Sequence, residues 1–193
     1  MTKISLIVGL GNPGKEYAQT RHNAGFWFVE QLADRYEISL KADPKFHGIS
    51  GRGNIEGHDV RLLLPSTFMN RSGQSVVPFT KFYQIQPEAI LIAHDELDMN
   101  PGVIRLKTGG GHGGHNGLRD IVPHIGANFH RLRIGIGHPG AKERVSGHVL
   151  GKAPSSEQAL MDAAIDHALS KVKMLVDGQV SQAMNQINAY KPA

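Results

Sequence analysis

The sequence contains no cysteine in its 193 residues. This absence excludes disulfide bonds, zinc sites built from thiolates and a cysteine nucleophile. Long apolar runs are also missing, since none approaches the roughly 20 residues that a helix needs to cross a bilayer. The strand-like run at residues 4–8 is too short for the core of a signal peptide. We therefore expect a soluble protein that stays in the cytoplasm and does not enter a membrane.

Two catalytic motifs are absent as well. The chain has neither the G-x-S-x-G elbow that presents a serine nucleophile nor the H-E-x-x-H pattern of helical zinc sites. Without an activated serine or a thiol, the simplest hydrolytic scheme is a water molecule that a side-chain base activates.

The composition is that of an ordinary packed domain. Apolar residues make up 40% of the chain and charged residues 20%, which does not indicate a disordered or fibrous protein. At this length we expect a single domain that spans residues 1–193.

The positive charge is concentrated in one part of the chain. The net charge is only +4, but residues 99–152 hold eight basic residues and just Asp120 and Glu143 as acids. Clustered cations without matching anions favour a polyanionic partner, because binding of phosphates releases their counterions. An ordinary solvated basic face is the alternative. The basic residues are Arg105, Lys107, Arg119, Arg131, Arg133, Lys142, Arg144 and Lys152.

Apolar runs of strand length alternate with amphipathic segments of helix length. This order predicts an α/β fold with one domain, in which helices cover both faces of a twisted mixed β-sheet. Residues expected to cap helices are Asn23, Ser72 and Asn116, and a capping box at 155–158 is expected to open a long helix that ends at Gly178. The expected strands are 4–8, 46–55, 58–64, 90–93, 103–107 and 132–136, and the other expected helices are 23–36, 72–83, 116–125 and a last one ending near residue 190.

The segment 137–152 is rich in glycine and basic residues. We therefore expect a mobile surface loop that acts as a lid or gate.

A glycine motif follows the first predicted strand. Residues 9–14 match G-x-G-x-x-G, which binds dinucleotides when a helix begins at the glycines. Here the expected helix begins about nine residues later, and Pro13 removes one backbone donor. The motif therefore favours a tight loop that presents Asn12 and, further on, Tyr17.

His22 and Asp95 both lie where strands give way to loops. Asp95 follows a buried strand, and ligands of α/β proteins bind at such strand ends. A carboxylate that accepts from one imidazole nitrogen leaves the other nitrogen free to act as a base. Taken alone, His22 is by default explained as a surface or capping histidine, so its contact with Asp95 is a hypothesis.

The most unusual stretch is Gly-Gly-Gly-His-Gly-Gly-His-Asn-Gly at residues 109–117. So many glycines indicate unusual backbone angles or close approach by a ligand. His112 and His115 are one candidate pair of metal ligands, although a catalytic zinc site needs a third protein ligand. The other hypothesis is a wall in which Asn116 offers its amide to substrate or water, and a simple helix cap explains Asn116 equally well.

The segment 67–73 also follows a predicted strand. Asn70 supplies another amide there, while Phe68 and Met69 supply apolar contact. The residues alone leave three functions open. The first is a hydrolase built on His22 and Asp95, the second a non-catalytic RNA-binding module, and the third an oxidoreductase that uses the glycine motif.

Six blocks in this order resemble the bacterial peptidyl-tRNA hydrolases over nearly the whole chain. Any single block can arise by chance, but the ordered set is highly specific. The blocks are VGLGNPG with Tyr17 (8–17), TRHNAG (20–25), PSTFMN (65–70), HDELD (94–98), GGHGGHNG (110–117) and FHRLRIGIG (129–137).

The resemblance implies hydrolysis of the ester that joins a peptide to the 3′ ribose of tRNA. It implies that His22 is the general base and that Asp95 orients it, with no metal and no cofactor. It also implies a cytoplasmic monomer in which residues 137–152 form a gate. The implied substrate-binding residues are Asn12, Tyr17, Met69, Asn70, His115 and Asn116, and the implied tRNA contacts are Arg105, Lys107, Arg133 and Lys142.

Overall fold

The computed structural model describes residues 2–193 and confirms the predicted fold class. The seven-stranded sheet has the order β2-β3-β4-β1-β5-β7-β6. Its four central strands, β4, β1, β5 and β7, are parallel, and the antiparallel neighbours lie toward the two edges. The strands are β1 Leu6–Gly9, β2 Lys41–Asp43, β3 Gly48–Ile55, β4 His58–Pro65, β5 Ile90–Glu96, β6 Ile104–Thr108 and β7 His130–Gly135.

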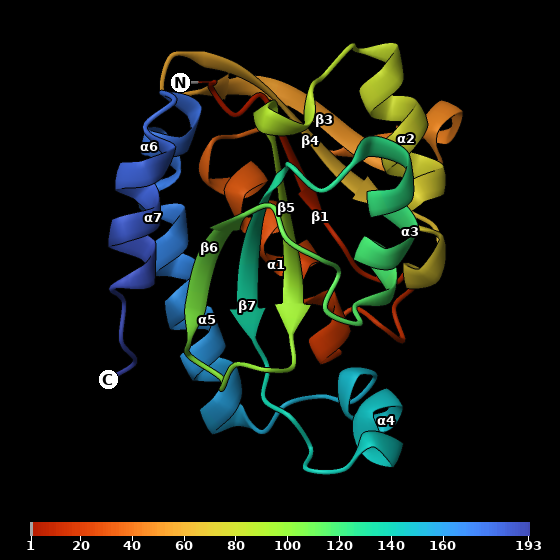
Figure 1. The fold of residues 1–193 in the computed structure, drawn as a ribbon, viewed down its shortest axis with the longest axis vertical. Helices are drawn as coiled ribbons and strands as arrows, with labels where there is room; N and C mark the ends of the chain where they lie inside the picture. Colours follow the sequence, from red (N-terminus) through yellow and green to blue (C-terminus); the bar gives the residue numbers. More distant parts are fainter. Residues whose placement is uncertain (1) are drawn as a thin grey trace.

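Helices cover both faces of this sheet, as predicted (Figure 1). Helix α1 and the C-terminal helices α5, α6 and α7 pack on one face, and α2 and α3 pack on the other. The short α4 lies apart from both layers, beyond the ends of β5 and β7 (Figure 1). The helices are α1 Ala24–Arg35, α2 Gly73–Phe82, α3 Asn116–Ile125, α4 Val145–Val149, α5 Ser155–Leu169, α6 Val172–Val176 and α7 Val180–Asn188.

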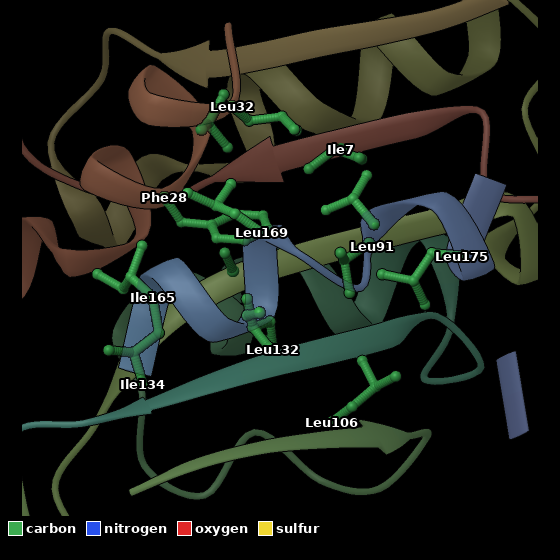
Figure 2. Packing of buried hydrophobic residues seen from close by; sticks show 14 of the residues in the cluster. Ile7, Phe28, Leu32, Leu91, Leu106, Leu132, Ile134, Ile165, Leu169 and Leu175 are labelled. Carbon is green, nitrogen blue, oxygen red and sulfur yellow. The ribbon is translucent and has the colours of Figure 1, made fainter. Parts of the chain in front are cut away.

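The central strands are buried on both faces, which explains their continuous apolar sequence. In β1, Ile7 points to the α1 and α5 side, whereas Leu6 and Val8 point to the α2 and α3 side. Figure 2 shows Ile7 and Leu91 on the sheet together with Phe28 of α1 and Leu169 of α5. The alternation of side chains along each strand thus supplies two separate cores from one apolar run.

The predicted hairpin is present between β3 and β4. Glu56 and Gly57 both have positive φ angles, 51° and 88°, as a two-residue hairpin turn requires. Strand β3 begins at Gly48 and not, as predicted, at residue 46, because the chain at Pro44–Phe46 forms a short 3-10 turn.

Three local predictions for residues 137–178 were wrong. The long helix expected after residue 155 is divided, since α5 ends at Leu169 and α6 begins only at Val172. The expected capping box does not form, because Pro154 occupies the N-cap position and no side chain caps α5. Segment 137–152 is not entirely loop, since it contains a 3-10 turn followed by α4.

Among residues 2–193, no helix combines the length and the apolar character that crossing a membrane requires.

Candidate active site

The site lies at the carboxyl ends of two adjacent parallel strands. β1 and β5 pair along their length, with Gly9 opposite Ala93, so the residues that follow them meet at one edge of the sheet. This edge is the usual ligand position in α/β proteins. A cleft of about 530 Å³ opens there, and its lining includes Asn12, His22, Met69, Asn70, Asp95, His115, Asn116 and Lys142.

A glycine allows the first helix to reach these strand ends. A Cβ atom on Gly25 would lie 2.3 Å from the carbonyl oxygen of Ala93 and 2.7 Å from the nitrogen of Leu10. Only glycine therefore fits where α1 begins beside β1 and β5. This close approach brings His22, three residues earlier in the chain, to Asp95. Helix α1 starts at Ala24, which confirms that no helix begins at the glycine motif.

His22 and Asp95 form a buried pair. The Nδ1 atom of His22 lies 2.8 Å from Oδ2 of Asp95. A carboxylate can only accept, so Nδ1 carries the proton and Nε2 carries the lone pair. Burial lowers the pKa of His22, but the charge of Asp95 and the hydrogen bond to it outweigh burial and leave this pKa above 6.5. The imidazole is therefore a stronger base than a free histidine.

His115 binds the other oxygen of the same carboxylate. Its Nε2 lies 2.8 Å from Oδ1 of Asp95, and its Nδ1 accepts from the backbone N–H groups of Gly117 and Leu118. These bonds fix the tautomer, because Nδ1 accepts and Nε2 must donate. Burial raises the pKa of Asp95, yet the attraction of His22 and His115 and their hydrogen bonds hold it well below its usual range.

His115 also occupies the N-cap of α3, so the prediction that Asn116 caps this helix was wrong. Asn116 is the first residue of the helix, and its side chain is exposed at the cleft. A cap requires only an acceptor near the first N–H groups, and the Nδ1 of His115 supplies it.

Asn12 is held in one orientation. Its Oδ1 accepts from the backbone nitrogen of Met69 at 2.7 Å, so the amide NH₂ group remains for the cleft. Asn23 was predicted to cap α1, but its amide instead bonds both the nitrogen and the carbonyl oxygen of Asn12, at 2.8 and 3.0 Å. These two bonds fix the loop that carries Asn12, which explains why Asn23 caps no helix.

The other predicted substrate residues are less constrained. Asn70 lies in a 3-10 turn and is exposed at the cleft. Ser72, the predicted cap of α2, instead donates to the carbonyl oxygen of Met69 in the same turn. Tyr17 is not among the residues that line the cleft; it packs edge-on against Phe68, which does line it, with ring centroids 6.2 Å apart. Tyr17 thus supports the cleft wall through Phe68.

The structure groups a different set of candidate metal ligands from the pair His112 and His115 that the sequence suggested. The ligand atoms of His22, Asp95 and His115 lie within 4.8 Å of one another. His112 is not part of this cluster, and its Nδ1 accepts from the nitrogen of Gly114. Both oxygens of Asp95 already accept from imidazoles, so an ion bound here would replace two hydrogen bonds. The geometry therefore fits a hydrogen-bonded network better than a coordination site.

Basic residues gather on the antiparallel pair β6 and β7. Arg105 lies opposite Arg133, and Lys107 lies opposite Arg131. Like charges in directly opposed positions are destabilising unless an anion lies nearby. Lys107 is exposed, whereas Arg133 is half-buried and donates to Oε1 of Glu96 at 3.0 Å.

Arg131 has a different role from its neighbours. Its side chain is buried and donates to the carbonyl oxygens of Gly110, Gly111 and Ala127. It therefore supports the glycine-rich loop that carries His115. A count of charges along the sequence cannot distinguish this arginine from an exposed one.

Segment 137–152 lies against the loop that carries His22. Lys142 lines the cleft together with apolar residues of α4. Arg21, which the sequence did not single out, donates from Nη1 to the carbonyl oxygen of His148 at 2.9 Å. Its backbone nitrogen also donates to the carbonyl oxygen of Gly151. The residue before His22 thus joins the loop that carries His22 to this segment.

Comparison with known proteins identifies similar chains over the full length. A family model described as peptidyl-tRNA hydrolase matches residues 6–193. Proteins named peptidyl-tRNA hydrolase from Acinetobacter baumannii and Acinetobacter baylyi are 91% and 86% identical, each with 100% of both chains covered. A crystal structure of the Acinetobacter baumannii protein superposes with a TM-score of 0.99 at 90% identity, covering 100% of this chain and 98% of that one.

Proposed function

The chain belongs to the peptidyl-tRNA hydrolase family, an enzyme family that hydrolyses peptidyl-tRNA, and we propose that His22, oriented by Asp95, activates the attacking water. The single observation that carries this proposal is the 2.8 Å contact between Nδ1 of His22 and Oδ2 of Asp95. It places the only N–H proton of the neutral ring on Nδ1, which faces Asp95. The lone pair of Nε2 is then available to a water molecule.

The reaction proceeds by proton transfer to and from this nitrogen. Nε2 of His22 takes a proton from water as the water oxygen attacks the ester carbonyl. The ester bond to the 3′ ribose oxygen then breaks, and the imidazolium returns the proton to that oxygen. Asp95 stabilises the imidazolium while it exists. Water supplies the atoms added to the two products, and no metal or cofactor enters these steps.

Amide groups of asparagines stabilise the negative charge on the carbonyl oxygen. Asn12 directs donors toward the cleft because Met69 occupies its oxygen. Asn70 and Asn116 carry further amides at the cleft lining. A preorganised donor of this kind contributes about 10²–10³ in kcat.

The tRNA contacts the basic residues beside the cleft. Arg105, Lys107 and Arg133 lie on β6 and β7, and Lys142 lies at the cleft itself. Glu96 pairs with Arg133, and a phosphate relieves the repulsion that remains between the opposed Lys107 and Arg131, which supports this assignment. Residues 137–152 act as a gate through which the acceptor end enters, and the enzyme works as a monomer in the cytoplasm.

Replacement of His22 with alanine tests the mechanism. Loss of a general base lowers kcat for peptidyl-tRNA by at least ~10²-fold. His124→Ala is the matched control, because His124 is an exposed histidine of α3 away from the cleft. Turnover of His22→Ala at the rate of His124→Ala would overturn the role of His22.

A further inference from the structure

His94 is a buried histidine that the mechanism above does not use. It precedes Asp95 on β5, and only 2% of its surface is exposed. Its Nδ1 lies 2.8 Å from the backbone carbonyl oxygen of Asp95. Because a carbonyl can only accept, Nδ1 carries the proton and Nε2 carries the lone pair.

The ring of His94 also supports the second imidazole on Asp95. It packs edge-on against His115, with ring centroids 4.9 Å apart and an interplanar angle of 63°. His94 therefore touches the backbone of Asp95 and the side chain that holds the Asp95 carboxylate. A shift of this ring changes the position of both.

The other nitrogen of His94 is buried and has no hydrogen-bond partner among residues 2–193. His94 lines a second pocket of about 80 Å³ beside the cleft, whose lining includes Glu96, Lys107, Arg131 and Arg133. Nδ1 is engaged with the backbone of β5, so Nε2 is the atom left for this pocket.

The same pocket contains a complementary donor. Nε of Arg131 is also buried without a partner among the described residues, and Arg131 lines the pocket with His94. One nitrogen can only accept and the other can only donate. A water molecule needs about 10–15 Å³ and two or more polar partners, and the pocket offers both.

This pocket also adjoins the proposed phosphate contacts. Lys107 and Arg133 line it, and Glu96, which binds Arg133, lines both the pocket and the catalytic cleft. A phosphate that draws Lys107 or Arg133 outward changes the hydrogen bonds available inside the pocket. His94, which lines this pocket, contacts both Asp95 and His115.

We propose that His94 is a positioning residue that transmits phosphate binding at Lys107 and Arg133 to the His22–Asp95 pair. It does so through a hydrogen bond that its Nε2 accepts from a water molecule in the second pocket. This proposal rests on the proposed function, which assigns tRNA phosphate to Lys107 and Arg133. Burial, followed by repulsion from His115, lowers the pKa of His94 to about 3, so the ring stays neutral and acts by geometry.

A double-mutant cycle tests the transmission. Lys107→Ala is combined with His94→Phe, which keeps the ring but removes both nitrogens. The substrates are a peptidyl-tRNA and the same peptide esterified to a single nucleoside, which lacks the contacted phosphate. In the native background Lys107→Ala lowers kcat for peptidyl-tRNA as well as raising KM. In the His94→Phe background it raises KM only, and the coupling factor in kcat is about 2- to 30-fold.

Two controls separate this role from a general loss of structure. His94→Asn keeps an amide donor near the position of Nδ1, so its kcat on the nucleoside ester is higher than that of His94→Phe, but it still lacks the coupling. His130→Phe removes another buried histidine, whose nitrogens contact Thr108 and the carbonyl oxygen of Glu88 far from the cleft, and it leaves the effect of Lys107→Ala on kcat unchanged. Thermal unfolding of each variant identifies any that fail to fold, and His94→Asn then replaces His94→Phe in the cycle.

The outcomes distinguish the two proposals. If Lys107→Ala and Arg133→Ala leave peptidyl-tRNA turnover unchanged in the native background, the phosphate contacts are wrong and the role of His94 fails with them. If Lys107→Ala lowers kcat by the same factor with and without His94, the phosphate contacts hold and the transmission through His94 is refuted.

Discussion

Asp95→Asn is a sharp test of the catalytic pair, because the structure predicts which way the new amide turns. Asp95 accepts two hydrogen bonds, one from Nδ1 of His22 and one from Nε2 of His115. An asparagine has only one oxygen to offer. His115 must donate from Nε2, since backbone N–H groups of Gly117 and Leu118 occupy its Nδ1. The amide oxygen therefore faces His115 and the NH₂ group faces His22.

The magnitude follows from the tautomer that His22 is forced to adopt. An NH₂ group beside Nδ1 requires that nitrogen to accept, which moves the proton to Nε2. The nitrogen that faces the cleft then has no lone pair for water. We expect kcat for peptidyl-tRNA to fall by ~10²–10⁴-fold, the contribution of a general base, with little change in KM.

A second substitution isolates this cause. In the Asp95→Asn background, His115→Phe removes the donor that holds the amide oxygen, so the amide can turn its oxygen to His22. We expect the double variant to be more active than Asp95→Asn, although loss of the α3 cap costs about 1 kcal/mol of stability. Steady-state hydrolysis and thermal unfolding measure the two effects. Near-native kcat in Asp95→Asn, or no recovery in a folded double variant, would refute the reasoning.

Three further predictions concern pH, RNA and packing. The rate rises with pH through the pKa of His22, which Asp95 holds above its ordinary value. In Asp95→Asn the midpoint of the kcat/KM profile moves to lower pH, because burial still lowers this pKa while the attraction of the carboxylate is lost. A midpoint that the substitution does not move would contradict this. Arg133→Ala raises KM for peptidyl-tRNA more than for the nucleoside ester and reduces the log–log salt slope by about 1, whereas equal losses on both substrates would place Arg133 at the chemistry. Gly25→Ala destabilises the fold by ~1–3 kcal/mol or more, because its Cβ would lie 2.3 Å from the Ala93 carbonyl oxygen. The Cβ of Gly147→Ala would meet no atom within 4 Å, so this control leaves the melting temperature nearly unchanged.

The strands and helices that form the layers of the fold could be predicted, because each is indicated by its own stretch of sequence. The continuous apolar runs of β1 and β5 indicate strands buried on both faces, and the alternating helices require a parallel central sheet. Once β1 and β5 are taken as parallel, the position of Asp95 at a strand end follows. The sequence therefore placed His22 and Asp95 at the correct edge of the sheet.

The partners of polar side chains could not be predicted in the same way. Asn23 at the start of a helix looks like a cap whether its amide bonds the helix or, as here, the backbone of Asn12. Either His115 or Asn116 can supply an acceptor to α3, and the contact of His115 with Asp95 decides between them. Such choices depend on residues distant in the sequence.

The sequence pattern also failed to show where a helix is interrupted and which charged residue is buried. Apolar residues continue in helical spacing from α5 into α6, so the break at Ser170 and Lys171 leaves no mark in the pattern. Arg131 counts as one more cation in the basic segment, although it is buried against backbone carbonyls. His94 stands beside Asp95 in the sequence, but only the structure reveals its contact with His115.

The bonds of Arg21 determine how freely the proposed gate can open. Its backbone nitrogen and its guanidinium hold the carbonyl oxygens of Gly151 and His148, so moving α4 away breaks bonds at the residue before His22. A neutral hydrogen bond contributes about 0.5–1.5 kcal/mol and one from a charged group about 1.5–3 kcal/mol. An open state that has lost both bonds is therefore a minor population, of about a few per cent or less. A substrate that enters by displacing α4 must supply this free energy from its own contacts, which couples gate opening to the orientation of His22, the proposed base.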